Sequence, residues 1–482
     1  MKILHSRLLL ILPLLLTVGC QSSNQKFENF FEGILKSENS GTAKTKEKKE
    51  KNALERFFSQ FKSGTINSNL DENITVSINS PKFKTFNRNN LSYNILTAVN
   101  YHPAVQSSMA NVRSAKMTVK AVESGKNTQV SFQALSGLIR ENSSNSFGAA
   151  GTLNVSRLLF DAGAIDNSIL SQKKRVQLAK VQAEIAAETI ALRAYEVWIN
   201  VHRQKKIMDV YDKGLSLAEP LLGQIKNISL SGLSDKAMIL KAQQDYSKLE
   251  VSNARARAEL EASKALFDEF FPGGDTGGLE SLKARTILQG NAAKNAMLKK
   301  SAVFRAQSFL IKAFEAEYKA LKAQKKPNVA MSAGVTAPAR DTIQDSSANV
   351  GIAVNYIFND GGRLDSQIEA LKEKIIETKR QKQTLERELG SQLNVAIEGY
   401  LGAKKTYYAT LELVNLSKEV RDTSKDQLVS GRSKIQDVLN AEVTLAENNI
   451  QLVIADAELK LASYRIRALT HGLTKEIGWK PF

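Results

Sequence analysis

The sequence predicts an α+β membrane protein built from two copies of one unit, in which a helix is followed by a β-hairpin, a long helix and a further helix. Three observations predict this fold class. Two stretches of the chain repeat each other 199 residues apart. Each copy contains two segments in which apolar and polar residues alternate. A very long helical pattern follows each pair of alternating segments.

Two motifs with one common offset carry the repeat. D-A-G-A-I-D-N-S-I begins at Asp161 and D-G-G-R-L-D-S-Q-I at Asp360, while S-G-L-S at Ser231 corresponds to S-G-R-S at Ser430. A constant offset across separated motifs indicates a duplicated structural unit. We predict the copies over 91–272 and 294–473, with a linker over 273–293 that begins with glycine-rich sequence and a C-terminal tail over 474–482.

The N-terminus has the pattern of a targeting signal. Lys2 and Arg7 precede an apolar run that is too short to span a bilayer but typical of a signal-peptide core. We predict a signal peptide over 1–19 and acylation of Cys20, the only cysteine, because L-L-T-V-G-C resembles a bacterial lipobox. An ordinary signal peptide with an incidental cysteine is the alternative. Residues 20–90 are polar and lysine-rich, which predicts a flexible tether after the anchor.

A helix and a hairpin open each copy. Ser92 is the expected cap of a helix to about Ser124, and its counterpart is expected from Asn295 to Lys325. Strands are predicted at about 129–139 and 148–160, and again at about 328–337 and 348–358. Each strand is apolar on one side and small or polar on the other, as in a tilted strand that crosses an outer membrane. A soluble sheet packed on a core would show the same alternation.

Long helices are predicted over 164–227 and 363–429, each roughly 100 Å long. Pro220 is expected to kink the first. Positions 364, 368, 371, 375, 378, 382, 385 and 389 alternate spacings of four and three, which is the seam of a coiled coil. The last helix keeps heptads too, from Val438 to Ile466. Two helices packed in a plain bundle would explain these heptads equally well.

The formal net charge of +18 comes mainly from lysine. These lysines are interleaved with Glu and Gln and lack aromatic platforms, so a solvated surface is favoured over nucleic-acid binding. The four histidines are scattered, and no metal-ligand spacing, catalytic motif or dinucleotide fingerprint is present. We therefore expect no cofactor, no metal and no enzymatic activity.

The order of elements behind a lipobox resembles the TolC-like outer-membrane factor family. The likeness covers about residues 90–473 and includes N-Y-H-P-A-V at Asn100, L-F-D-A-G at Leu159 and I-F-N-D-G-G-R at Ile357. It implies a homotrimer in the outer membrane, with a 12-stranded transmembrane β-barrel continued into the periplasm by a long α-helical coiled-coil barrel. Trimerisation also has an independent argument, because four strands cannot close alone and open edges are not tolerated in lipid. The resemblance assigns the barrel-to-helix turns to Phe160, Asp161, Gly163, Phe358, Asp360, Gly361 and Gly362.

The same resemblance assigns residues at the periplasmic tip. Asp437 and Asn440 fall where the family has acidic residues that narrow an aperture. A ring of charged side chains is a common selectivity device, although Asp437 is equally an early-helix acid favoured by the helix dipole. The turns that would meet an adaptor, or that simply cap helices, contain Ser231, Gly232, Ser430, Gly431 and Arg432.

By this resemblance the chain is expected to be the passive exit duct of a tripartite export system for small molecules. Its partners would be outer-membrane lipid, a periplasmic adaptor and an inner-membrane pump, either proton-driven or ABC-type. A type I protein secretion system is the alternative cargo route. A lipid-anchored periplasmic coiled-coil scaffold with soluble hairpins is the alternative of another class.

Overall fold

The computed structural model describes residues 86–87, 90–141, 144–230, 236–340 and 347–480. The signal peptide, Cys20, nearly all of the tether and the turn with Ser231 and Gly232 therefore lie outside the described residues. The chain divides into two compact units. Among described residues, the first consists of strand segments within 131–154 and 333–349. The second consists of 86–130, 155–332 and 350–480, which contain all the helices that follow here.

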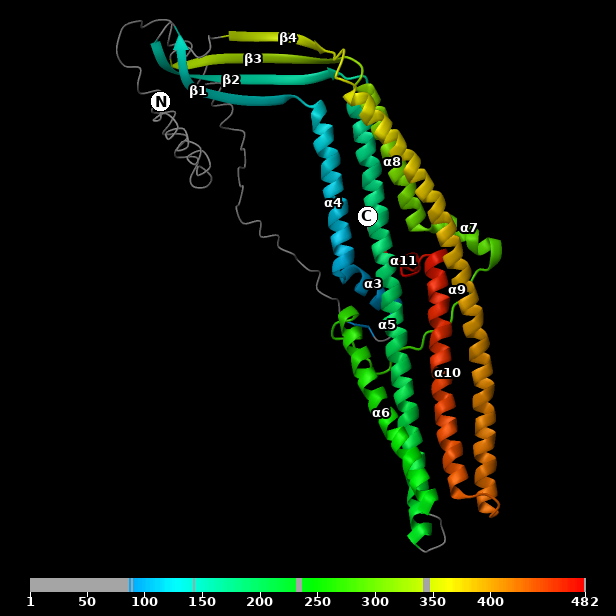
Figure 1. Cartoon of the computed structure of the whole chain (residues 1–482). Coiled ribbons are helices and arrows are strands. Elements are labelled where there is room, and N and C mark those ends of the chain that lie inside the picture. Colours follow the sequence, from blue (N-terminus) through cyan, green and yellow to red (C-terminus); the bar gives the residue numbers. More distant parts are fainter. Residues whose placement is uncertain (1–85, 88–89, 142–143, 231–235, 341–346, 481–482) are drawn as a thin grey trace, which may run out of the picture. The chain divides into compact units, whose positions relative to one another are not determined.

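The elements occur in the same order in both copies (Figure 1). The first copy contains α3 (Leu91–Tyr101), α4 (Pro103–Glu123), the 3₁₀ turn η1 (Ser124–Lys126), β1 (Gln129–Glu141), β2 (Ser144–Phe160), α5 (Ala164–Leu230) and α6 (Lys236–Phe270). The second contains α7 (Gly290–Lys300), α8 (Ala302–Ala323), β3 (Asn328–Arg340), β4 (Ser347–Asn355), α9 (Arg363–Val429) and α10 (Ile435–Thr470), after which α11 (Leu473–Glu476) follows.

Helix lengths support the duplication. Helices α5 and α9 both contain 67 residues. Helices α4 and α8 contain 21 and 22, and α6 and α10 contain 35 and 36. Both α4 and α6 pack along α5, and both α8 and α10 pack along α9 (Figure 1). Each long helix is therefore matched by two shorter ones, which is the arrangement of one unit used twice.

The helix expected from Ser92 to Ser124 is wrong in two respects. Its cap is Asn90, whose Oδ1 accepts a hydrogen bond from the backbone N–H of Tyr93 at 2.9 Å. It also breaks at His102, where ψ is 129°. Pro103 causes the break, because a proline disfavours helical geometry in the residue before it and is itself well placed at the first helical position.

The counterpart expected from Asn295 to Lys325 is also two helices. The break falls at Ser301, where ψ is 118°, and the Ser301 hydroxyl accepts a hydrogen bond from the Phe304 N–H at 3.3 Å. Serine is a favoured cap because its side chain satisfies an N–H that has no partner within the helix. Both copies thus start with a short helix followed by a longer one.

The four strands form one sheet in the order β1-β2-β3-β4. The strand predicted over 348–358 is shorter, because β4 ends at Asn355. The amide of Asn355 donates to Asn328 Oδ1 at 3.3 Å, and Asn328 is the first residue of β3. In the described part of the chain no strand lies opposite the residues after 355, since Pro327 precedes β3 and lacks an N–H group.

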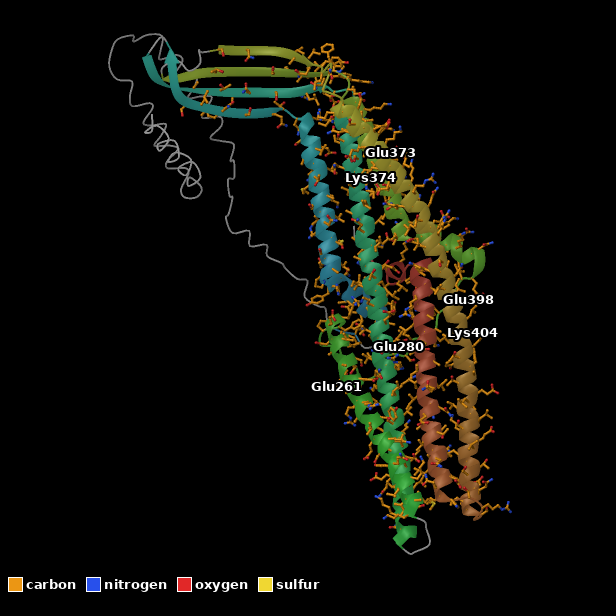
Figure 2. All side chains as sticks on the ribbon, viewed as in Figure 1. Glu261, Glu280, Glu373, Lys374, Glu398 and Lys404 are labelled. Atoms are coloured by element: carbon orange, nitrogen blue, oxygen red, sulfur yellow. The ribbon has the colours of Figure 1, made fainter. Side chains whose placement is uncertain are left out.

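The seam positions predicted for α9 are buried or half-buried, as both a coiled coil and a plain helical bundle require. All eight seam positions from Leu364 to Leu389 are buried or half-buried, while most residues between them are exposed. The heptad column of α10 from Val438 to Ile466 is likewise buried, apart from half-buried Leu452. Charged side chains such as Lys374, Glu398 and Lys404 stand on the outer faces of these helices (Figure 2). The basic charge is thus spread over exposed helix faces.

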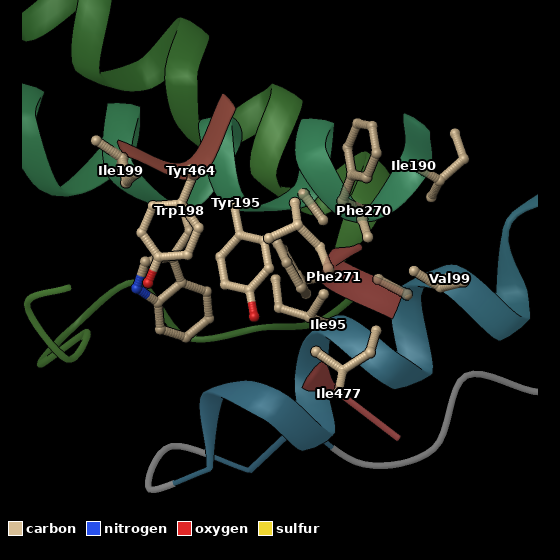
Figure 3. Close-up of a cluster of buried hydrophobic side chains, with 14 of the residues drawn as sticks. Ile95, Val99, Ile190, Tyr195, Trp198, Ile199, Phe270, Phe271, Tyr464 and Ile477 are labelled. Carbon is tan, nitrogen blue, oxygen red and sulfur yellow. The ribbon is translucent and has the colours of Figure 1, made fainter. Parts of the chain in front are cut away.

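The largest core surrounds Trp198 of α5 (Figure 3). The indole N–H donates to the carbonyl of Glu280 at 3.0 Å, which ties the inter-repeat linker to the helix. Tyr195 stacks on Tyr464 of α10 with ring centroids 4.6 Å apart. Phe267 of α6 and Phe271, which follows that helix, pack on Trp198 as well. The core therefore joins both copies of the repeat and the linker.

The segment predicted as a C-terminal tail contributes to this core. Leu473, the last residue of the predicted second copy, is fully buried. Within the predicted tail, Trp479 is nearly fully buried and its indole N–H donates to Asn100 Oδ1 at 3.1 Å. The carboxylate of Glu188 on α5 accepts hydrogen bonds from Leu473 N–H and from both the N–H and the hydroxyl of Thr474. Residues 473–479 are therefore a packed part of the fold.

Candidate functional site

The sheet has one polar and one apolar face, which side-chain contacts define. The Oγ1 atoms of Thr152 and Thr336 are 3.2 Å apart, so these side chains share a face. The ring of Phe132 lies against Gly151, on the opposite face. Alternation along each strand then places the following residues with Thr152: Ser131, Gln133, Leu135, Asn154, Ser156, Leu158, Phe160, Ser332, Gly334, Asn349, Gly351 and Asn355. The following lie with Phe132: Val130, Leu153, Val155, Leu159, Met331, Val335, Val350, Ile352 and Val354.

The polar face carries hydrogen-bonding groups without formal charge. Among its described side chains, at 129–137, 148–160, 328–337 and 347–355, none is charged. Asn154 and Asn349 lean over Gly334 from the two strands beside it. A Cβ atom on Gly334 would lie 2.6 Å from Asn349 Oδ1 and 2.9 Å from Asn154 Oδ1. Glycine is required there because the two amides occupy the space above it.

The apolar face is exposed in the single chain. Val350, Ile352 and Val354 of β4 are 82%, 68% and 65% exposed. Isolated exposed apolar residues are ordinary, but a continuous exposed apolar face indicates a surface that another apolar phase or a partner covers.

The barrel-to-helix turns predicted at Asp161 and Asp360 have the same geometry. Asp161 accepts from Gly163 N–H at 2.9 Å and Ile165 N–H at 2.6 Å. Asp360 accepts from Gly362 N–H at 3.1 Å and Leu364 N–H at 2.9 Å. Each carboxylate satisfies N–H groups at the start of a long helix, where the helix dipole also favours negative charge.

Aromatic residues flank these turns. Phe160 ends β2 and is 56% exposed, and Phe358 is 91% exposed. Tyr356 meets Phe358 edge to face, with ring centroids 4.7 Å apart. The chain thus changes from strand to helix beside exposed aromatic rings, which is the composition typical of a membrane–water interface.

The tip turn between α9 and α10 is tight and exposed. Gly431 has φ of 73°, and the N–H groups of Gly431 and Arg432 donate to the carbonyls of Leu428 and Gln427. Only glycine adopts this left-handed geometry at no steric cost. Ser430, Gly431 and Arg432 are therefore presented at the end of the helical hairpin, consistent with either a cap or a docking turn.

Asp437 and Asn440 share one exposed face of α10. Asp437 Oδ2 accepts from Lys434 N–H at 2.9 Å and contacts Ser433 Oγ at 3.2 Å, so this carboxylate caps the start of the helix. Both residues also line a groove of 380 Å³. Its other walls come from α9 and α10: Leu413, Leu416, Ser417, Val420, Ser424, Ala441 and Thr444. The capping role and a role at an aperture are compatible, since Asp437 stays exposed.

The buried side of α10 holds residues that sequence reasoning missed. Ile435 and Leu439, on the face opposite Asp437, pack into a cluster with α5 and α6. Glu442 is buried, with its carboxylate 2.6 Å from Lys425 Nζ and 3.6 Å from Arg421 Nη1 of α9. Apolar contacts therefore join α10 to α5 and α6, and ion pairs join it to α9. Leu439 lies beside the heptad column that starts at Val438 and not on it, so the heptad pattern marks neither its burial nor the helices that cover it.

The described residues contain no helix long and apolar enough to cross a bilayer. Across the same part of the chain, no three His, Cys, Asp or Glu side chains are arranged to hold a metal ion.

Comparisons with known proteins agree on one kind of protein. A family model described as "Outer membrane efflux protein" matches residues 294–472. Outer membrane efflux protein BepC of Brucella suis biovar 1 (strain 1330) is 19% identical over 396 residues, which cover 79% of this chain and 85% of BepC. The relationship thus spans most of both chains.

Solved structures share the fold. The channel protein CusC superposes with a TM-score of 0.71 at 11% identity, covering 81% of this chain and 93% of that one. VceC of Vibrio cholerae gives a TM-score of 0.66 at 15% identity, covering 79% and 96%. Identities this low establish the architecture alone.

Proposed function

We propose that this chain is a member of the outer membrane efflux protein family, whose model matches residues 294–472, and that three copies of it form a passive exit duct for small molecules across the outer membrane. Members of this family are outer-membrane channels that extend into the periplasm, and they are not enzymes. The proposal concerns what the family alone leaves open, namely assembly, anchoring, gating, partners and cargo.

The single observation that carries the proposal is the two-faced sheet with open edges. Strands β1 and β4 are the outermost strands of the sheet, and among the residues that the structure describes their outer edges pair with no other strand. In a bilayer no water is present to satisfy such edges, so the sheet must be closed by other chains. Three chains with four strands each give a barrel of 12 strands. The apolar face would then meet lipid, and the uncharged polar face would line the lumen.

The helices would continue the lumen into the periplasm. The seam of α9 and the heptads of α10 are suited to side-by-side packing in a hollow coiled-coil cylinder. We place the acylated Cys20 in the outer membrane as an anchor beside the barrel. A lipid chain and a barrel are mutually compatible anchors, because each adds apolar contact with the same membrane.

We place the gate at the tip of the helices. Three copies of Asp437 around the axis would favour cations at the narrowest point, with Asn440 as an uncharged second layer. The packing of Ile435 and Leu439 on α5 and α6 would hold each tip inward. Because Glu442 ties α10 to α9 through Lys425, those two helices would move outward together.

An adaptor bound at the tip turns would open the duct, and an inner-membrane pump would supply the energy. Crosslinking in cells tests this assignment. A variant with Ser430→Cys carries a thiol at the exposed tip turn, to which a photoactivatable crosslinker is attached before the captured protein is identified by mass spectrometry. Capture of an adaptor that pairs with a proton-driven pump is expected.

Other outcomes of this crosslinking experiment would support one of the alternative functions. An adaptor that pairs with an ATP-driven protein exporter would replace small-molecule cargo by type I secretion. Absence of any adaptor, together with a monomer on native gels, would contradict the duct and support a lipid-anchored scaffold. As a matched control, a cysteine in place of Ser252, which lies along the helical shaft on α6, should capture no adaptor.

A further inference from the structure

One charged residue stands on the apolar face of the sheet. Arg157 alternates with Val155 and Leu159 in β2, so its side chain leaves the sheet on the same face as theirs. Among the strand side chains that the structure describes, Arg157 is the only charge on this face. It is exposed, and no hydrogen bond or ion pair links it to a described residue.

The neighbours of Arg157 on β3 and β4 are apolar. The hydroxyls of Thr152 and Thr336 are in contact. Arg157 lies five positions after Thr152, and Met331 lies five positions before Thr336. In antiparallel strands this places Met331 beside Arg157. Counting in the same way from the Asn328–Asn355 contact places Ile352 beside Met331. Met331 and Ile352 are uncharged side chains that are 43% and 68% exposed, so neither supplies a counter-ion to Arg157.

Arg157 lies near the end of the strand that leads into helix. Phe160 ends β2 three residues later, roughly 10 Å further along the strand. Exposed aromatic rings of Phe160 and Phe358 mark that end, as they do at membrane interfaces. An arginine stem is long enough to lie along apolar surface while its guanidinium reaches the polar headgroups.

The position of β2 in the sheet indicates which partner can reach Arg157. Strand β2 lies between β1 and β3 and is not an edge strand, so in a closed barrel its outer face is not at a junction between subunits. The guanidinium is always charged, and an unpaired charge against hydrocarbon is strongly unfavourable. The planar guanidinium can donate two parallel N–H hydrogen bonds to two oxygens of one phosphate group.

We infer that Arg157 binds the phosphate of a phospholipid in the periplasmic leaflet, with one lipid per subunit. This site rests on the proposed barrel, because only there does the apolar face of β2 meet lipid. It would fix the depth of the barrel in the membrane, since the guanidinium would be held at the headgroups near the end of β2 that leads into helix.

Native mass spectrometry tests the site on the full-length protein. The wild type, Arg157→Gln and Arg157→Lys are purified in an uncharged maltoside detergent and titrated with phosphatidylglycerol. The wild-type trimer is expected to retain one more lipid per subunit than Arg157→Gln, and Arg157→Lys should retain it more weakly because it lacks the fork. Arg387→Gln is the matched control, since Arg387 is an exposed arginine on α9 outside the sheet, and it should retain as much lipid as the wild type.

Three results would overturn the inference. Equal lipid retention by wild type and Arg157→Gln trimers would remove the site while leaving the duct intact. Inorganic phosphate that displaces the lipid and itself remains bound would assign the site to a free oxyanion. A wild-type protein that forms no trimer would contradict the proposed function and this site together.

Discussion

Asp161 and Asp360, which are 199 residues apart, make the same two hydrogen bonds to the backbone that follows each of them. Each carboxylate accepts from the residue two positions on and from the residue four positions on. Both copies of the duplicated unit thus have the same aspartate cap where the strand leads into the long helix. The contributions of the two caps to stability can be compared with each other.

Replacing either aspartate by alanine removes two hydrogen bonds at a helix start. We expect Asp161→Ala and Asp360→Ala each to lower the free energy of unfolding by about 1–2 kcal/mol. The shift in thermal midpoint, followed by far-UV circular dichroism, measures the effect. Asp166→Ala is a suitable comparison for Asp161→Ala. Asp166 lies in the first turn of α5 and forms an exposed ion pair with Lys126, so it does not cap the helix. An equal loss in that variant would contradict the capping role.

The two turns differ at one backbone position, and exchanging the residues should have opposite effects. Ala162 has φ of 54° where the second copy has Gly361 with φ of 71°. A left-handed conformation costs an alanine roughly 1–2 kcal/mol, and glycine avoids this at some entropic cost. Ala162→Gly should therefore raise stability by about 0.5–1 kcal/mol and Gly361→Ala should lower it by a similar amount. Urea titration of both variants checks the sign, and changes of the same sign would contradict this account.

The turns and seams could be predicted from the sequence because they depend on short spacings along the chain. Asp360 is followed by two glycines, and the α9 seam repeats every seven residues, so neither needs knowledge of a neighbour. The breaks at His102 and Ser301 were missed because the apolar pattern continues through both. Pro103 was not recognised as the first residue of a second helix, α4.

Residues whose roles depend on an opposing element could not be predicted. Glu442 has the spacing of an ordinary helical acid, and only α9 shows that Lys425 and Arg421 meet it. Arg157 has the alternation of a strand, but its isolation appears only once the faces of β2 and β3 are known. Asp437 was expected either at an aperture or as an early-helix acid, and its hydrogen bond from Lys434 N–H supports the second expectation.

Truncation of Leu439 should weaken the packing of the first turns of α10 on α5 and α6 at the periplasmic tip. The side chain is fully buried in the cluster that joins α10 to α5 and α6. Leu439→Ala should remove about 2–5 kcal/mol of packing free energy, and the tip should then open more readily. Planar-bilayer recordings are expected to show a larger mean conductance than for the wild type. Val429→Ala, which truncates a side chain that is 90% exposed at the same end, should leave the conductance unchanged. Equal conductance in all three proteins would show that this cluster does not hold the tip closed.

His202 should lower the free energy of unfolding as the pH falls below neutral. Burial, followed by the charges of Lys206 and Lys460, lowers its pKa to about 4 from the ordinary 6.5, while Asp456 acts in the opposite direction. Because the folded protein binds this proton less readily than the unfolded chain, the contribution is present above pH 6.5 and is lost progressively towards pH 4. Between pH 7 and pH 5 the wild type should lose about 1–2 kcal/mol more than His202→Gln, after allowance for a half-buried side chain. Identical losses in both proteins, measured by urea unfolding, would contradict this.

Closure of the barrel between subunits is the central claim, and crosslinking of the sheet edges tests it most directly. Cysteine pairs that join β1 and β4, with Val130 or Phe132 combined with Val350, Ile352 or Val354, would be introduced in one chain and oxidised in cells. Within one chain these strands lie at opposite edges of the sheet, so a disulfide between them must join different subunits. A closed barrel predicts a covalent ladder on denaturing gels that stops at the trimer. A ladder that continues beyond three subunits, or only monomers at every pair, would contradict the account.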